Sequence, residues 1–209
     1  MDSSAETWAA RLNRLARGTL RGPAWEAGAP GAVRAAELDR LAPRDLSSTL
    51  PHRAVLARVL RVDPGPPTRE ISNHTAWWWT LHACGHRPPL PPGDGPLLPH
   101  LQAEGIETWT QAELSTLHAL WNASEPGDSG RARCLLAAAW LVREVQPDNA
   151  TLLPWAVHVF VLGARAGLPS AEALHYADTL VHNVIAGGSL SSPLAGAILL
   201  DAARALGTT

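Results

Sequence analysis

Residues 170–207 read SAEALHYADTLVHNVIAGGSLSSPLAGAILLDAARALG and contain two helical patterns separated by a short turn rich in glycine and serine. In the first pattern, apolar residues recur every three or four positions, which places them on one face of a helix. This stripe consists of Leu174, Ala177, Val181 and Val184. The second pattern begins at Ser192-Pro193, and proline favours the first position of a helix. The stretch therefore predicts two helices joined as a hairpin.

The same rhythm extends upstream through residues 110–207. Further helix starts are expected near Thr110, Ser129 and Asn149, and Thr110 with Glu113 has the spacing of a capping box. Consecutive helices joined by short turns pack as antiparallel neighbours. We therefore predict an all-α fold of about eight to ten helices, arranged as antiparallel hairpins in a bundle or a short α-hairpin stack. At 209 residues, the chain 1–209 is expected to form a single domain.

The first half of the chain gives weaker signals. Residues 1–70 contain most of the arginines and three short helical patterns, the first of which opens with the capping-box pair Ser3 and Glu6. Residues 72–84 favour a strand by composition, but the chain offers no partner strand, so we predict a helix there. Residues 87–99 contain many prolines and predict an ordered or extended loop.

Composition limits the classes of partner. Hydrophobic residues make up 46 % of the chain and the net charge is −2, so a broad nucleic-acid surface is not expected. All 17 basic residues are arginine, which we attribute first to codon bias. Two groups of arginines leave a local anion or nucleic-acid contact open as a third, weaker hypothesis; they are Arg11, Arg14, Arg17, Arg58 and Arg61.

The location of the protein is predicted from missing signals. The first residues lack the charged and apolar regions of a secretory signal, which favours the cytoplasm. The most apolar stretch, residues 150–164, is too short to cross a bilayer and contains Pro154 and His158. We therefore expect no membrane segment, and we expect Cys84 and Cys134 to remain thiols.

One group of residues is compatible with a metal ion. His175, Asp178 and His182 fall at positions i, i+3 and i+7, so they lie within about 60° of one another on a helix. If the preceding helix turns back near Leu168, His158 would come level with Asp178 and complete a set suited to zinc or iron. The alternative is a solvated helix face beside a core histidine.

Tryptophan is the strongest oddity of the composition, with nine Trp beside one Phe and one Tyr. Trp77, Trp78 and Trp79 are consecutive, so on a helix they point about 100° apart and cannot share one stripe. Either this helix is central and buried nearly all round, or it exposes a tryptophan. An exposed tryptophan commonly anchors a partner.

The sequence contains none of the common motifs for phosphate loops, dinucleotide binding, esterases or zinc proteases. Our leading hypothesis is therefore a non-catalytic helical module for protein–protein interaction or scaffolding. It would bind another protein, or a second copy of itself, through Trp77 to Trp79 and the proline-rich loop. The alternative is a metal-binding helical protein, possibly a metal-dependent hydrolase, that uses His158 with the His175 group.

Overall fold

A computed structural model describes six stretches of the chain, namely residues 5–44, 50–66, 73–82, 88–99, 105–145 and 152–207. Within these stretches the fold is all-α, as predicted, and contains nine α-helices. Their bounds are α1 Ala5–Thr19, α2 Gly31–Leu41, α3 Leu50–Leu60, α4 Asn73–Thr80, α5 Ile106–Ala123, α6 Ser129–Glu144, α7 Val157–Gly163, α8 Ser170–Ala186 and α9 Pro193–Gly207. Two short 3-10 helices, η1 Pro23–Trp25 and η3 Ser189–Ser191, precede α2 and α9.

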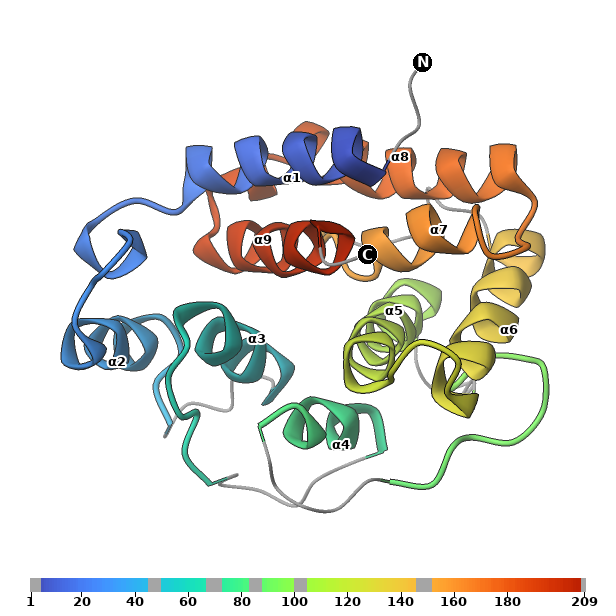
Figure 1. Ribbon diagram of the computed structural model, residues 1–209, viewed down its shortest axis with the longest axis horizontal. Helices are drawn as coiled ribbons and strands as arrows, with labels where there is room; N and C mark the ends of the chain where they lie inside the picture. Colours follow the sequence, from blue (N-terminus) through green and yellow to red (C-terminus); the bar gives the residue numbers. More distant parts are fainter. Residues whose placement is uncertain are drawn as a thin grey trace.

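The last helix, α9, packs against three other helices near the middle of the molecule (Figure 1). It contacts α1 along one side, α3 along another and α7 near its end. Helix α4 lies on the far side of α3 and α5 from α1, so α3 and α5 occupy the middle of the molecule. The first and last helices of the chain thus share one hydrophobic core, which contains both Trp8 and Leu206.

The close approach of α1 and α9 depends on small residues. Gly196 of α9 faces the end of α1, where an added Cβ would lie 3.0 Å from the Thr19 Cβ and from two carbon atoms of Leu20. Ala195 and Ala197, its neighbours, are also fully buried. A helix with small residues on its contact face lets another helix pack tightly against it, so this pair forms the upper layer of the core.

Two details of the predicted helix starts are wrong. Helix α5 begins at Ile106, and Thr110 is a buried residue inside it rather than its cap. The Glu113 carboxylate does not close a capping box; its two oxygens accept hydrogen bonds from the backbone N–H groups of Leu97 and Leu98 at 2.7 and 2.8 Å. Tertiary contact with the proline-rich loop has displaced a local interaction. The start expected near Asn149 lies outside the described residues, and the next described helix, α7, begins at Val157.

The proline-rich loop is held by two charged side chains. Glu113 of α5 binds its second half, while Arg133 of α6 donates hydrogen bonds to the carbonyl oxygens of Pro91 and Pro96, both at 2.8 Å. Residues 88–99 are therefore attached to the bundle by hydrogen bonds between their backbone and two ionisable side chains. Ser3, Cys84, Asn149 and the start of this loop at residue 87 lie outside the described residues. No described helix is both long enough and apolar enough to cross a membrane.

Candidate functional site

The three consecutive tryptophans belong to the core. Trp77, Trp78 and Trp79 expose 3 %, 0 % and 3 % of their surface, because α4 packs against both α3 and α5. The Trp78 indole N–H donates to the Ser115 hydroxyl at 3.0 Å, and its ring lies 5.4 Å from the ring of Trp155. The first alternative, a helix buried nearly all round, therefore holds. These side chains have almost no surface to offer a partner, and the interaction hypothesis loses its main support.

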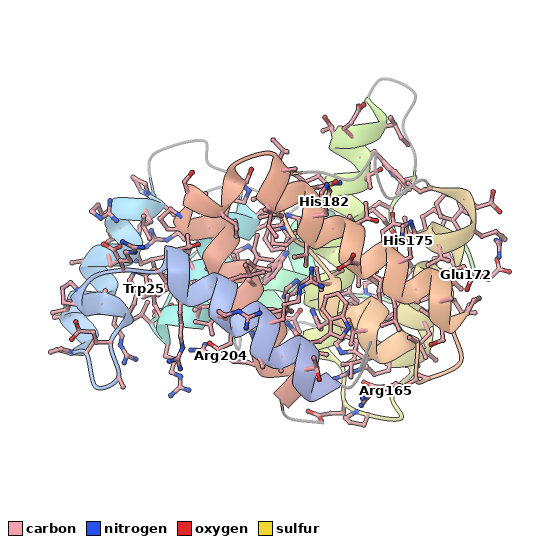
Figure 2. The ribbon with its side chains drawn as sticks, turned by 90° about the horizontal axis from the view of Figure 1, so that it is seen from above. Trp25, Arg165, Glu172, His175, His182 and Arg204 are labelled. Carbon is pink, nitrogen blue, oxygen red and sulfur yellow. The ribbon has the colours of Figure 1, made fainter. Side chains whose placement is uncertain are left out.

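The predicted metal ligands are not brought together. His158 is fully buried on α7, whereas His175, Asp178 and His182 are exposed on α8 (Figure 2). The two helices instead meet through apolar faces, where Phe160 stacks on Tyr176 at 4.4 Å. The solvated face of α8 thus points away from α7.

The Asp178 carboxylate is already paired, with the Arg11 guanidinium 2.6 Å away. Among the described residues, no group of three His, Cys, Asp or Glu side chains could hold a metal ion. The zinc or iron site inferred from the His175 spacing is therefore not assembled in this structure.

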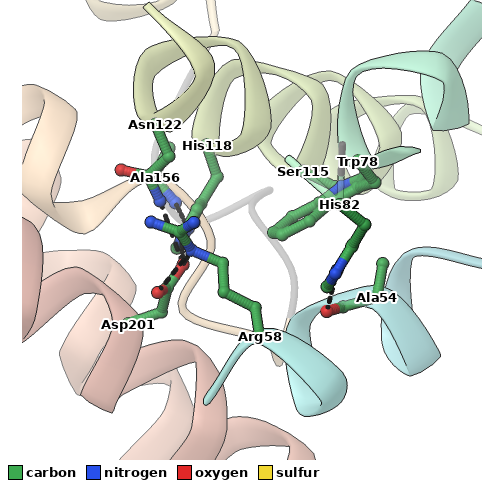
Figure 3. A network of polar contacts seen from close by, with 9 residues as sticks. All are labelled: Ala54, Arg58, Trp78, His82, Ser115, His118, Asn122, Ala156 and Asp201. Carbon is green, nitrogen blue, oxygen red and sulfur yellow. Dashed lines mark hydrogen bonds and ion pairs between the residues drawn. The ribbon is translucent and has the colours of Figure 1, made fainter. Parts of the chain in front are cut away.

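A buried polar network at the centre of the molecule was not foreseen from the sequence (Figure 3). Asp201 of α9 is 2 % exposed and accepts hydrogen bonds from three side chains. The donors are Arg58 Nε at 2.9 Å, Asn122 Nδ2 at 3.0 Å and His118 Nε2 at 3.1 Å. The network joins α3, α5 and α9, which are far apart in the chain, so no local motif could have predicted it.

The hydrogen bonds fix the protonation of this network. The Nδ1 atom of His118 accepts the backbone N–H of Ala156 at 3.1 Å, so the ring proton must sit on Nε2 and point to Asp201. Burial lowers the pKa of His118, which keeps the ring neutral. Burial opposes ionisation of Asp201, but the His118 bond and the Arg58 charge hold its pKa below the ordinary value. Both ring nitrogens of His118 are engaged, so this His–Asp pair is not a free general base.

A second buried histidine lies beside the first. The rings of His158 and His118 meet edge to face at 4.4 Å, and neither nitrogen of His158 has a hydrogen-bond partner among the described residues. Burial, with the neighbouring charges, lowers the pKa of His158 well below its ordinary value. His158 therefore acts as a neutral core residue and not as a ligand.

We expect these buried histidines to make the protein sensitive to acid. Burial also lowers the pKa of His82, and it lowers the pKa of His52 to about 4. The folded chain keeps these rings neutral while the unfolded chain takes up protons near pH 6.5, so stability should fall as the pH drops below that value. Each such histidine adds up to about 1.4 kcal/mol per pH unit to the slope. Urea unfolding at pH 7.5 and pH 5.0 measures the loss.

Glu113 has the opposite effect on the pH dependence of stability, because burial raises its pKa to about 7. Its carboxyl group takes up a proton in the folded state first, so it offsets one histidine of the four. The variant His158→Phe should flatten the acid slope, whereas His175→Gln, on the exposed face of α8, should leave it unchanged. A slope that His158→Phe does not alter would contradict the expected role of this ring.

A pocket of about 700 Å³ opens between α1, η1, α2, α3 and α9. Four arginines line it, namely Arg17 of α1, Arg34 of α2, Arg204 of α9 and Arg61, which directly follows α3. Glu26 is the one carboxylate among the described lining residues, so the charged side chains sum to +3. The remaining wall consists of Asn13, Gly28, Trp25 and several leucine, valine and alanine residues. Such a volume lies within the roughly 300–1,000 Å³ typical of small-molecule sites.

The arginines of this pocket, which we call the arginine pocket, are poorly balanced by acids. In the part of the chain that the structure describes, Arg17, Arg34 and Arg61 form no ion pair. The Arg34 Nη1 atom donates to the Leu60 carbonyl at 3.3 Å, but its Nε–H is buried and has no partner. A buried guanidinium N–H without an acceptor is costly, and the indole N–H groups of several core tryptophans also lack a partner among the described residues.

Arg61 occupies a backbone position that favours glycine. It follows the last residue of α3 with φ = 58°, and the Val62 N–H reaches back to the Ala57 carbonyl at 3.0 Å. This is the arrangement of a helix end whose left-handed residue is usually glycine. For a residue with a side chain, this backbone conformation costs about 1 kcal/mol of conformational energy. Strained backbone of this kind is found more often at functional sites.

The positive charges of the arginine pocket lie close enough to affect one another. Burial lowers the pKa of Arg204, and the charges of Arg61, Arg58 and Arg34 lower it further. The Asp201 carboxylate acts in the other direction, but it already pairs with Arg58. The pocket therefore concentrates positive potential in a partly enclosed space, which attracts anions.

Comparisons of the chain with protein-family models, with curated proteins and with solved structures gave no match. The function must therefore be inferred from the site itself. Arg17 and Arg61 belong to the two arginine groups that the sequence marked as possible anion contacts. Arg34 and Arg204 carried no sequence signal, because α2 and α9 meet the other two helices only in the folded chain.

Proposed function

We propose that this protein binds a small anionic ligand in the arginine pocket. The main support for this proposal is that four arginines line one cavity whose described lining contains a single carboxylate. These are Arg17, Arg34, Arg61 and Arg204. Guanidinium groups donate paired hydrogen bonds to phosphate and carboxylate oxygens. A bound anion would offset the mutual repulsion of the four charges, so the ligand would also stabilise the fold.

A structural role explains only part of this cluster. Arg34 and Arg204 each donate one hydrogen bond to the last carbonyl oxygens of α3, on Leu60 and Val59. Cations at a helix C-terminus are favourable, and these two side chains would stabilise α3 in any case. Arg17 lies in the last turn of α1 and donates a hydrogen bond to Asn13 Oδ1 at 3.2 Å, so the same explanation extends to it, but not to Arg61 in its strained position. An anion in the pocket accounts for all four.

The pocket supports binding better than catalysis. Its described lining contains four arginines and one glutamate but no histidine, cysteine or serine. It thus offers electrostatic recognition without a nucleophile, while the His118–Asp201 pair is closed off by its own hydrogen bonds. Binding of another protein or of a second copy stays a prediction, since Trp77 to Trp79 no longer supply a surface for it.

The variant Arg61→Gly separates ligand binding from stability. Calorimetric titration with inorganic phosphate should show affinity about tenfold weaker than for the unchanged protein, because a hydrogen bond between charged groups is lost. The same change removes the backbone strain, so the free energy of unfolding should rise by up to about 1 kcal/mol. A loss of binding together with a gain of stability cannot be explained by damage to the fold.

The matched control is Arg165→Ala, which removes one positive charge at the opposite end of the molecule from Trp25 (Figure 2). It lowers the net charge by the same amount and should leave phosphate affinity unchanged. Equal weakening in both variants would mean that phosphate senses only the overall charge. No binding of phosphate to the unchanged protein at millimolar concentrations would refute the proposal.

A further inference from the structure

The arginine pocket is much larger than a bare anion requires. Its volume of about 700 Å³ suits a drug-sized molecule, whereas an inorganic phosphate would fill only a small part of it. The remainder of the described wall is largely apolar, and its main members are Leu20, Ala24, Trp25, Leu60 and Leu200. A ligand that occupies this space must therefore carry an apolar body as well as a charged group.

We infer that the ligand is a phosphate monoester with a flat aromatic group, whose phosphate meets the arginines and whose ring rests on Trp25. This inference builds on the proposed function and names the ligand class for the same pocket. The net charge of +3 favours phosphate over a single carboxylate, because a phosphate monoester carries about −1.5 to −2 at neutral pH. Trp25 is the one aromatic side chain among the described lining residues.

Trp25 is held in place before any ligand arrives. It ends the 3-10 helix η1, which follows Gly22 at φ = 103° and begins with Pro23, and its backbone N–H donates to the Gly22 carbonyl at 3.1 Å. The short helix η1 packs against α2, whose Glu37 accepts two hydrogen bonds from Arg40 at 2.7 and 2.8 Å. These bonds lower the pKa of Glu37, and the nearby Trp25 side chain lowers it further.

The position of this ring suits stacking. Trp25 is only half-buried, as is Trp140, whereas Trp78 and Trp155 are almost completely covered. Part of its aromatic surface is exposed to water, which is unfavourable, and a flat ligand group would cover that surface. A ring whose backbone is held in the short helix η1 loses little freedom when a ligand stacks on it, and this favours binding.

The test compares phenyl phosphate with inorganic phosphate by calorimetric titration of the full chain. For the unchanged protein, phenyl phosphate should bind roughly tenfold more tightly, since stacking on an aromatic side chain contributes an effect of that size. Trp25→Leu should abolish this difference while the affinity for inorganic phosphate stays the same. Trp25→Phe keeps an aromatic face without the indole N–H and should retain most of the difference.

Each outcome bears on a different claim. If inorganic phosphate binds but phenyl phosphate binds no more tightly, or if Trp25→Leu keeps the preference, the inferred ligand class is wrong and the anion pocket stands. If neither compound binds, the proposed function itself fails. Circular dichroism of both variants shows whether they remain folded, and Trp25→Phe serves as the folded reference should Trp25→Leu unfold.

Discussion

Replacement of Asp201 by alanine is expected to lower the free energy of unfolding by about 3–5 kcal/mol, the usual cost of removing one partner from a buried ion pair. The Asp201 carboxylate accepts hydrogen bonds from Arg58, His118 and Asn122 in the middle of the molecule. Without it, three donors lose their acceptor and the Arg58 charge loses its partner. Urea unfolding followed by circular dichroism at pH 7.5 measures the change.

The control for this variant is Asp178→Ala, which breaks the exposed ion pair with Arg11. Exposed ion pairs contribute about 0–1 kcal/mol, so the two aspartates should differ severalfold in their effect. If Asp201→Ala cost no more than Asp178→Ala, the buried network would not be a significant source of stability.

The network also positions the arginine pocket. Arg58 and Arg61 are three residues apart on or just after α3, and Asp201 and Arg204 are three residues apart on α9, so each pair lies on neighbouring parts of its helix surface. The Arg58–Asp201 ion pair therefore fixes the relative placement of α3 and α9 beside the pocket. A folded Asp201→Asn protein should show weaker phosphate binding for this reason.

Replacement of Trp78 by alanine should destabilise the protein by about 3–5 kcal/mol, the range for truncating a large buried aromatic side chain. Trp78 is fully buried, and its ring contacts those of His118 and Trp155 at a tilt. Its indole N–H donates a hydrogen bond to Ser115. The variant would leave a cavity between α4 and α5 and an unsatisfied hydroxyl group. The urea midpoint provides the measurement.

Trp25→Leu is the matched comparison for Trp78→Ala, because Trp25 is half-buried at the rim of a pocket. It should cost much less stability, although it removes an indole ring as well. A Trp78→Ala protein as stable as the unchanged chain would show that α4 is not part of the core, and it would restore the tryptophan surface as a candidate for partner binding.

Local patterns were enough to predict helices α8 and α9. The stripe of Leu174, Ala177, Val181 and Val184 specified α8, and Ser192-Pro193 specified the start of α9. These features depend on contacts within about four residues, which a helix makes with itself. The all-α fold class and the expected number of helices follow from the same short-range signals.

Local patterns failed where tertiary contacts compete with them. Glu113 has the spacing of a capping box with Thr110, yet its carboxylate binds the backbone of the proline-rich loop. His175, Asp178 and His182 share a helix face, but α7 packs against the other face of α8. Nothing in the spacing of these residues says which face of a helix a neighbour will cover.

The sequence by itself determined that the chain forms amphipathic helices with a large apolar core, because side-chain periodicity and capping act over a few residues. Only the tertiary structure decided which of its polar residues meet. Asp201 pairs with Arg58 across 143 positions of the chain, and the four arginines of the pocket come from helices at both ends of it. Such contacts depend on how helices pack, and packing is set by the shapes of whole faces rather than by the spacing of residues along one of them.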